Sequence, residues 1–312
     1  MKIKEKNFVS AVIYVHNAEK RIESFLQTII RVMEEHFENS EIICVNDCSD
    51  DESVRVIRQV SQNASITSVS ILNLSCFHGL EIAMNAGVDL TIGDFVLEFD
   101  NTVFDFEEEK IMEIYYRSLQ GYDVVSASPN QKERFASGLF YRIFEQFTYP
   151  SYKMGTERFR ILSRRGINRV SSMNRTVPYR KAIYANSGLK TDCIKYSVTG
   201  RSIIRRDKNE KKYRLGLAVD SLLLFTEVGY RFSIAMTMLM MFMSVFMLLY
   251  SILVYVMSNP VAGWTTTILF LSMAFFGVFG ILTVIIKYLQ LLVRLVFRRK
   301  QYSFESIEKL TK

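Results

Sequence analysis

The sequence predicts an α/β domain with a mostly parallel, doubly wound sheet, followed by a transmembrane hairpin of two helices. Three observations support this fold class. Between residues 8 and 99, short apolar segments alternate with amphipathic ones, as in strand–helix–strand units. No charged residue occurs in residues 232–286, although 23% of the chain is charged. Basic residues concentrate on both sides of that uncharged stretch, as they do beside membrane spans.

The expected strands and helices follow one another without an internal repeat. The apolar run in "FVSAVIYV" is the first strand, and a signal peptide is less favoured because no small-residue cleavage site follows it. A helix comes next, because apolar residues recur at helical spacing: Ile22, Phe25, Leu26, Ile29 and Met33. The pattern then predicts further elements in this order: a buried strand at 41–45, a helix at 51–62, a strand at 68–74, a helix at 79–90 and a strand at 94–99.

Acidic and polar residues follow the ends of two of these strands. Asp47, Ser49 and Asp51 come after the second strand, and Asp100 comes after the fourth. Doubly wound sheets bind ligands at the carboxyl ends of their strands, where a carboxylate can contact a nucleotide or hold a metal against a diphosphate. For Ser49, capping of the next helix is an equally good interpretation. Glycine-rich phosphate loops of the G-x-G-x-x-G or Walker type are absent from the sequence.

The uncharged stretch contains two apolar runs, residues 232–257 and 264–286, separated by "SNPVAG". Each run exceeds the roughly 20 residues that a helix needs to cross a bilayer, and a buried helical hairpin is the alternative. The flanks are basic and the connecting turn is not, which predicts a multi-pass protein of the cell inner membrane with both termini in the cytoplasm. The net charge of +7 is therefore assigned to anionic lipid rather than to nucleic acid, for which no motif is present.

Four sequence segments, taken in order, resemble the family 2 glycosyltransferases of GT-A fold. They are "VIYVHNAEKRI", "VNDCSDDES", "GLEIAMNAGVDLTIGDFVLEFDN" and "FRILSRR", followed by the expected hairpin. The pattern is most similar to the polyprenyl-phosphate glycosyltransferase branch, which includes dolichol-phosphate mannose synthase. The resemblance implies five parts: a GT-A domain at 1–200, a basic juxtamembrane segment at 201–231, transmembrane helices at 232–257 and 264–286, and a cytoplasmic tail at 287–312.

The resemblance also implies roles for individual residues. Nucleotide contacts are expected from residues at the ends of the first, second and fourth strands: Val15, Asn17, Glu19, Asp47, Ser49, Asp51 and Asp100. The family's D-x-D motif, which holds Mg2+ or Mn2+ and the sugar diphosphate, falls on Asp100, Asn101 and Thr102. Asp100 is therefore expected to be catalytic and, with Thr102, to bind the metal, although family members usually carry a second carboxylate where Thr102 stands. Asp105 is either a further ligand or a solvated loop residue.

Residues for the acceptor are expected around the "FRILSRR" segment. Glu157 is the only acid shortly before it and is the candidate catalytic base. A phosphate acceptor has a second pKa of about 6 and needs cations more than a base. The candidates are Arg160, Arg164, Arg201 and Arg205, for which binding of lipid headgroups is the alternative role.

Together these features predict transfer of a sugar from a nucleotide diphosphate sugar to polyprenyl (undecaprenyl) phosphate, with inversion, for cell-envelope polysaccharide. Two alternatives stay open: a hydroxyl-bearing glycan or lipid acceptor, and a non-catalytic nucleotide-binding relative, which the altered D-x-D motif suggests. A transporter is disfavoured because the two spans contain no charged residue. A homo-oligomer is compatible with all of these features.

Overall fold

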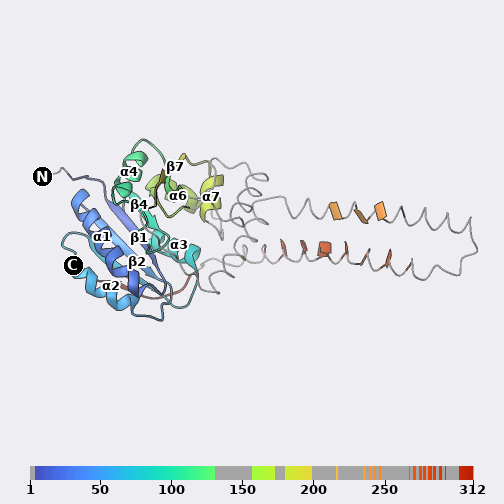
Figure 1. The fold of residues 1–312 in the computed structure, drawn as a ribbon, viewed down its shortest axis with the longest axis horizontal. Helices are drawn as coiled ribbons and strands as arrows, with labels where there is room; N and C mark the ends of the chain where they lie inside the picture. The colour runs from blue at the N-terminus through green and yellow to red at the C-terminus, as the bar shows by residue number, and fades with distance from the viewer. Residues whose placement is uncertain are drawn as a thin grey trace, which may run out of the picture. The chain divides into compact units, whose positions relative to one another are not determined.

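The computed structural model describes residues 4–130, 157–172, 180–198 and 302–311, together with separate helical positions between 216 and 292. The chain divides into two compact units. The first comprises Met1–Ala218 and Arg299–Lys312, and the second comprises Val219–Arg298. Within the first unit, a twisted sheet lies between helices (Figure 1). This arrangement confirms the predicted α/β class.

The sheet has eight strands in the described part of the chain, in the order β7-β5-β6-β4-β1-β2-β3-β8. Their bounds are β1 (Val9–Val15), β2 (Ser40–Asn46), β3 (Ser68–Leu74), β4 (Phe95–Phe99), β5 (Val124–Pro129), β6 (Phe159–Ser163), β7 (Thr191–Tyr196) and β8 (Phe304–Lys309). Strands β4, β1, β2 and β3 are parallel to one another, and β5 is parallel to β7. Strand β6 is antiparallel to β4 and β5, and β8 is antiparallel to β3. The sheet is therefore mostly parallel, as predicted.

Helices cover both faces because the apolar residues of the strands point alternately to two separate buried clusters. The helices α1 (Glu19–His36), α2 (Ser53–Ser61) and α4 (Glu109–Ser118) contribute to the first cluster. The helices α3 (Leu80–Leu90), α6 (Arg164–Ser172) and α7 (Arg180–Asn186) cover the other face. Helix α3 approaches β1 and β2 closely at Gly87, where an added Cβ would lie 2.4 Å from Val12 Cγ1. Only glycine fits that contact.

The first four strands and the three helices between them lie within a few residues of their predicted positions. The later strands and helices were not predicted. Strand β8 lies in the segment expected to be only a cytoplasmic tail, and it forms the edge of the sheet beside β3. The two guanidinium nitrogens Nε and Nη2 of Arg58 contact the Glu308 carboxylate at 3.0 and 2.9 Å, which fixes β8 to α2.

The predicted spans fall in the second unit, and most of their residues lie outside the described part of the chain. Among the positions that are described, no helix is both long and apolar enough to cross a membrane. Those positions are helical, and several carry exposed apolar side chains, such as Phe242 at 69% and Leu292 at 56%. An added Cβ at Gly277 would lie 2.6 Å from Met240 Sδ, so the backbone at Gly277 packs against that side chain. The hairpin stays a prediction.

Candidate active site

The loops that follow β1 and β2 are joined by hydrogen bonds between side chains and main chain. Ser49 Oγ accepts the Asn17 N–H at 3.1 Å, and Asn17 Oδ1 accepts the Asp50 N–H at 2.9 Å. Asp51 Oδ2 accepts the Glu19 N–H at 2.9 Å. Val15 is the last residue of β1, and β1 is parallel to β2. The residues expected in the first two nucleotide-binding segments therefore all lie at the carboxyl ends of these strands. Ser49 contacts the neighbouring loop, so its role here is not helix capping.

Asp51 has a second contact that orders the start of α2. Its Oδ1 accepts the Ser53 N–H at 3.0 Å, and it also accepts the Ser53 hydroxyl. Burial opposes ionisation of Asp51, but the hydrogen bonds from Ser53 and Glu19 outweigh it and lower the pKa of the carboxyl. The carboxylate therefore stays charged while it ties two loops and a helix together.

The structure places Asp47 differently from the expectation of a nucleotide contact. Its side chain is fully buried. Oδ1 accepts the His78 N–H at 2.8 Å, while Oδ2 accepts the Gly79 N–H at 2.8 Å and the Tyr14 hydroxyl at 3.0 Å. Three donors thus occupy a carboxylate that was expected to bind base or ribose. As placed here, Asp47 holds the loop before α3 instead of facing a ligand.

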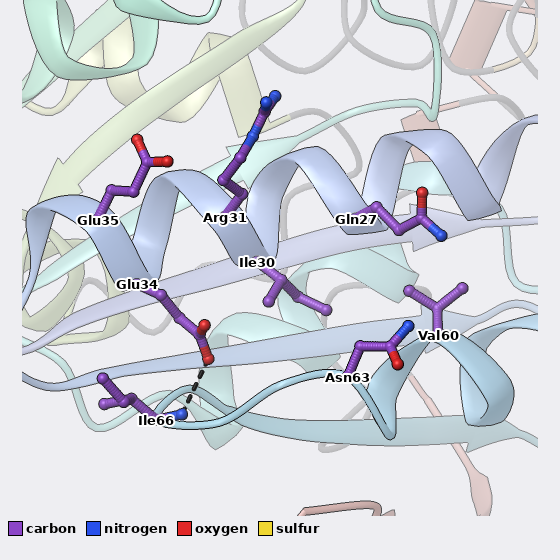
Figure 2. Close-up of a pocket in the computed structure, with 8 residues that line it drawn as sticks. All are labelled: Gln27, Ile30, Arg31, Glu34, Glu35, Val60, Asn63 and Ile66. Atoms are coloured by element: carbon purple, nitrogen blue, oxygen red, sulfur yellow. Dashed lines mark hydrogen bonds between the residues drawn. The ribbon is translucent and has the colours of Figure 1, made fainter.

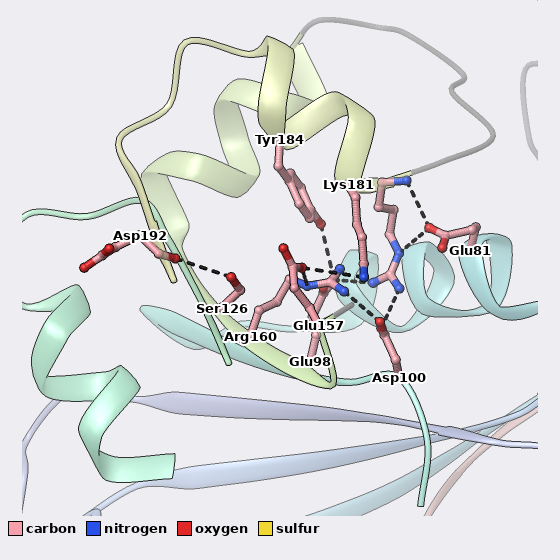
Figure 3. Close-up of polar contacts among 10 residues, drawn as sticks. Glu81, Glu98, Asp100, Ser126, Glu157, Arg160, Lys181, Tyr184 and Asp192 are labelled. Atoms are coloured by element: carbon pink, nitrogen blue, oxygen red, sulfur yellow. Dashed lines mark hydrogen bonds and ion pairs between the residues drawn. The ribbon is translucent and has the colours of Figure 1, made fainter. Parts of the chain in front are cut away.

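Asp100 follows β4 and contacts two arginines. Arg160 Nη2 lies 2.7 Å from Asp100 Oδ2, and Arg180 Nη2 lies 2.9 Å from Asp100 Oδ1. Both guanidinium groups also reach Glu98, at 3.1 Å for Arg160 Nη1 and 2.7 Å for Arg180 Nη1. Figure 3 shows Glu98, Asp100 and Arg160 close together, near Glu81 of α3. The Oε2 atom of Glu81 lies 3.0 Å from Arg180 Nε. Both oxygens of Asp100 are therefore engaged.

Strand register explains why Arg160 lies beside Glu98. These two residues are directly paired across the antiparallel strands β4 and β6. Their sequence neighbours Phe99 and Phe159 point to the opposite face and pack in the first apolar cluster. Arg160 and Arg180 are 0% and 1% exposed, so the buried positive charge of each is compensated by its carboxylate partners and not by water.

We call this group the arginine–carboxylate cluster. Its seven members are Glu81, Glu98, Asp100, Glu157, Arg160, Arg180 and Lys181. Four carboxylates and three cations leave one formal negative charge among these members. Burial opposes ionisation of Asp100, but the charges of Arg160 and Arg180 lower its pKa to about 2. Asp100 is thus ionised throughout the physiological range.

Tyr184 of α7 packs against the arginine–carboxylate cluster and contacts Glu98 and Arg160. Its hydroxyl donates to Glu98 Oε1 at 3.4 Å, and its ring lies 5.8 Å from the Arg160 guanidinium carbon. Burial and the nearby Glu98 charge raise the pKa of the phenol. Tyr184 is therefore a neutral hydrogen-bond donor to a charged group.

The residues at Asp100 do not fit the expected Mg2+ or Mn2+ as they are placed. Asn101 Oδ1 accepts the Val103 N–H at 2.9 Å, and Thr102 is buried and carries no charge. Asp105, the further candidate ligand, contacts Arg158 Nε at 3.1 Å and accepts the Tyr196 hydroxyl at 3.1 Å. Nowhere in the described residues do three or more His, Cys, Asp or Glu side chains form a group that could hold a metal ion.

Comparison with known proteins identifies the family. Residues 10–173, more than half of the chain, match the sequence model of glycosyl transferase family 2. The chain belongs to this family. It is 28% identical over 188 residues to the uncharacterized glycosyltransferase sll0501 of Synechocystis, with 58% of each chain covered. It is 26% identical over 199 residues to the bactoprenol glucosyl transferase of Shigella phage SfX, with 62% of this chain and 64% of the relative covered.

Both matches span less than two thirds of the relative's own length. Among solved structures, the mannosyltransferase PcManGT from Pyrobaculum calidifontis, in complex with GDP-Man and Mn2+, is similar with a TM-score of 0.49 and 12% identity. That similarity covers 70% of this chain and 63% of the other.

In this family 2 glycosyltransferase, the expected acceptor residues that the structure describes, Glu157, Arg160 and Arg164, do not form one group. Glu157 is buried and its Oε2 lies 3.3 Å from Arg160 Nε, so it belongs to the cluster and does not face an open site. Arg164 donates to the carbonyl oxygens of Thr91 and Gly93 at 3.0 and 2.9 Å. Arg160 and Arg164 lie at opposite ends of β6, so they cannot hold the same phosphate. Arg201 and Arg205 lie outside the described residues.

A hollow of about 420 Å³ lies between α1 and the segment that leads from α2 to β3 (Figure 2). Glu34 lines it, and its Oε1 accepts the N–H groups of Ser65 at 2.7 Å and Ile66 at 2.9 Å. Burial opposes ionisation, but these bonds lower the pKa of Glu34. The hollow lies at the amino end of β3, whereas Asp100 follows the carboxyl end of β4. The hollow is therefore on the opposite side of the sheet's strands from the candidate site and is not part of it.

Proposed function

We propose that this family 2 glycosyltransferase moves a sugar from a nucleotide diphosphate sugar to a polyprenyl phosphate such as undecaprenyl phosphate, with inversion. The observation that carries the proposal is the uncharged apolar stretch 232–286, which follows the family 2 domain in the sequence. A water-soluble acceptor would not need such a stretch, whereas a lipid-linked acceptor is reached at a membrane. The similarity to a bactoprenol glucosyl transferase supports the same acceptor class.

The proposed reaction is a single displacement. An oxygen of the acceptor phosphate attacks the anomeric carbon, a new carbon–oxygen bond forms, and the bond to the diphosphate oxygen breaks. The nucleoside diphosphate leaves with the electron pair of that bond. Because a phosphate monoester is already largely ionised at neutral pH, no residue has to remove a proton from it. This is consistent with Glu157 being held in an ion pair.

The nucleotide would bind along the loops after β1 and β2, where Asn17 and Ser49 are held by mutual hydrogen bonds. Such fixed loops lose little conformational entropy when a ligand binds. The sugar diphosphate would lie toward Asp100, because β4 is the neighbour of β1 on the other side from β2. The residues around Asp100, as placed, do not fit a metal ion.

The membrane part of the proposal places the catalytic domain and both termini in the cytoplasm, beside the inner membrane. Exposed apolar residues at described helical positions of the second unit support insertion of residues 232–257 and 264–286 into a bilayer, among them Phe246 and Phe275. Basic residues on either side of the two spans suit anionic headgroups.

The test uses the full chain, purified in detergent, with a panel of labelled nucleotide sugars. Undecaprenyl phosphate is the acceptor, and undecaprenol, which has a hydroxyl in place of the phosphate, is its matched control. We expect label in the lipid fraction with the phosphate acceptor alone. Label on undecaprenol would favour the hydroxyl-acceptor alternative. Nucleotide binding without transfer to any acceptor would favour a non-catalytic relative.

A further inference from the structure

The family resemblance places a divalent cation at Asp100, yet in this structure two arginines occupy both oxygens of that carboxylate. We propose that the guanidinium groups of Arg160 and Arg180 occupy the cation position at Asp100 in place of Mg2+ or Mn2+. This inference rests on the proposed function, because Asp100 is the expected position of a cation only if a sugar diphosphate binds there. Its test is a metal-binding measurement, which needs no turnover.

The contacts of each arginine show why neither can easily make room for a metal. Arg160 is paired in the strand register with Glu98, and its three nitrogens contact Glu98, Asp100 and Glu157. Arg180 likewise contacts carboxylates from α3, from β4 and from the segment after β4. Moving either side chain away would leave several buried carboxylates without one of their cations, which is strongly unfavourable.

The residues after Asp100 support the same conclusion. A hard divalent cation prefers several oxygen ligands, with carboxylates providing charge. Here Thr102 supplies no charge, and the Asn101 side-chain oxygen is used by the Val103 N–H. With threonine instead of the family's usual second carboxylate at position 102, Asp100 is the only charged ligand of the motif, which is too few for a dication. A single carboxylate can still pair with two guanidinium groups that other carboxylates share. The threonine at position 102 and the arginine contacts of Asp100 therefore support the same inference.

Charge balance adds a further argument. The seven members of the arginine–carboxylate cluster sum to one negative charge. A dication added among them would turn that sum positive, and it would lie next to guanidinium nitrogens that are already 2.7 and 2.9 Å from Asp100. Like charges in a buried site repel strongly. Nucleotide affinity should therefore depend little on Mn2+.

The test measures binding of Mn2+ to the full-length protein by electron paramagnetic resonance, after treatment with a chelator and without nucleotide. Mn2+ free in solution gives a sharp signal that is lost on binding to protein. We expect wild type and Asp100→Asn to give the same titration, since Asp100 holds no metal. The inference is overturned if wild type binds a Mn2+ that Asp100→Asn fails to bind.

A gain-of-binding variant tests the physical cause. Thr102→Asp combined with Arg180→Met restores a second carboxylate and removes one guanidinium, so we expect affinity for Mn2+ to rise by at least about tenfold. Arg165→Met is the matched control, because the Arg165 side chain is 72% exposed and pairs with Asp123 outside the cluster. If the double variant does not fold, the comparison of wild type with Asp100→Asn still decides the inference.

A nucleotide titration separates this inference from the proposed function. UDP and GDP are titrated by calorimetry, once with EDTA and once with Mn2+. We expect a similar affinity in both conditions for the nucleotide that binds. An enhancement by Mn2+ of about tenfold or more that Asp100→Asn removes would overturn the inference. Absence of binding by any nucleotide diphosphate or nucleotide sugar would instead count against the proposed function, while the Mn2+ titration would still decide the inference.

Discussion

Replacing Arg160 by methionine removes a cation that contacts three of the four carboxylates of the cluster. Methionine is similarly long and apolar, so it can fill the space with little loss of packing. The change takes an ion pair from Glu98, Asp100 and Glu157, each at 3.3 Å or less from an Arg160 nitrogen. The side chains of Glu98 and Glu157 are at most 2% exposed and that of Asp100 is 10% exposed, so water can replace little of the lost charge.

The expected loss of stability can be estimated from those contacts. Removing one partner of a buried ion pair destabilises a protein by roughly 3–5 kcal/mol, and Arg180 still compensates Glu98 and Asp100. We therefore expect about 3–5 kcal/mol in total, or a lowering of the melting temperature on the order of 10 °C for a domain of this size. Transfer activity should fall as well, because Asp100 loses the contact that orients it.

The same variant has a pH signature. The pKa of Asp100 is lowered from its ordinary 3.8 to about 2, which corresponds to a stabilisation on the order of 2 kcal/mol at neutral pH. This contribution is complete above the unfolded value and is lost as the pH falls through about 2. In Arg160→Met the pKa of Asp100 rises, since one of the two cations that lower it is gone. The stability difference between wild type and variant should therefore narrow as the pH is lowered below about 5.

The assay is thermal unfolding of the full chain in detergent, followed by intrinsic fluorescence at neutral and acidic pH. Arg165→Met is the control, and because its ion pair is exposed to solvent the melting temperature should change little. If Arg160→Met melts no lower than Arg165→Met, the cluster does not stabilise the fold, and the reasoning is refuted.

Three further predictions concern other parts of the chain. Gly93→Ala should destabilise the protein by about 1–3 kcal/mol in the same unfolding assay, because the new Cβ would lie 2.5 Å from Ser10 Oγ and 2.7 Å from the Ser10 backbone nitrogen. An unchanged melting temperature would contradict this close packing of Gly93 against Ser10. Tyr14→Phe removes one of the three donors to Asp47 and should lower stability by about 1 kcal/mol, whereas no effect would mean that the hydroxyl bond does not form. Ser258→Cys should react with a membrane-impermeant thiol reagent in intact cells; reaction only after lysis would contradict the predicted topology.

The sequence allowed the first half of the domain to be predicted because its signals are local. A buried strand such as 41–45 and a helix with apolar residues at regular spacing each show in a short window. Strand β8, "FESIEK", has mixed polarity and forms only because β3 offers an edge far away in the sequence. Periodicity within a window cannot detect such a partner.

The site shows the same limit. The position of Asp100 at a strand end was predicted correctly, but its partners Arg160 and Arg180 are 60 and 80 residues away in the chain. One signal was present in the sequence: Glu98 in "VLEF" and Arg160 in "FRIL" are single, opposite charges within apolar strands. Charged residues are almost never buried without a partner, so these two could have been paired with each other.

The position of β8 also has a consequence for the order in which the protein is made. Strand β3 ends at Leu74 and its neighbour β8 begins at Phe304, so roughly 230 residues separate their synthesis. At about 5–20 residues per second, the outer edge of β3 waits on the order of 10–50 s for its partner. An unpaired strand edge is a template for another chain during that interval. Translation products that stop before residue 304 would keep this edge open permanently, and we expect them to associate through β3.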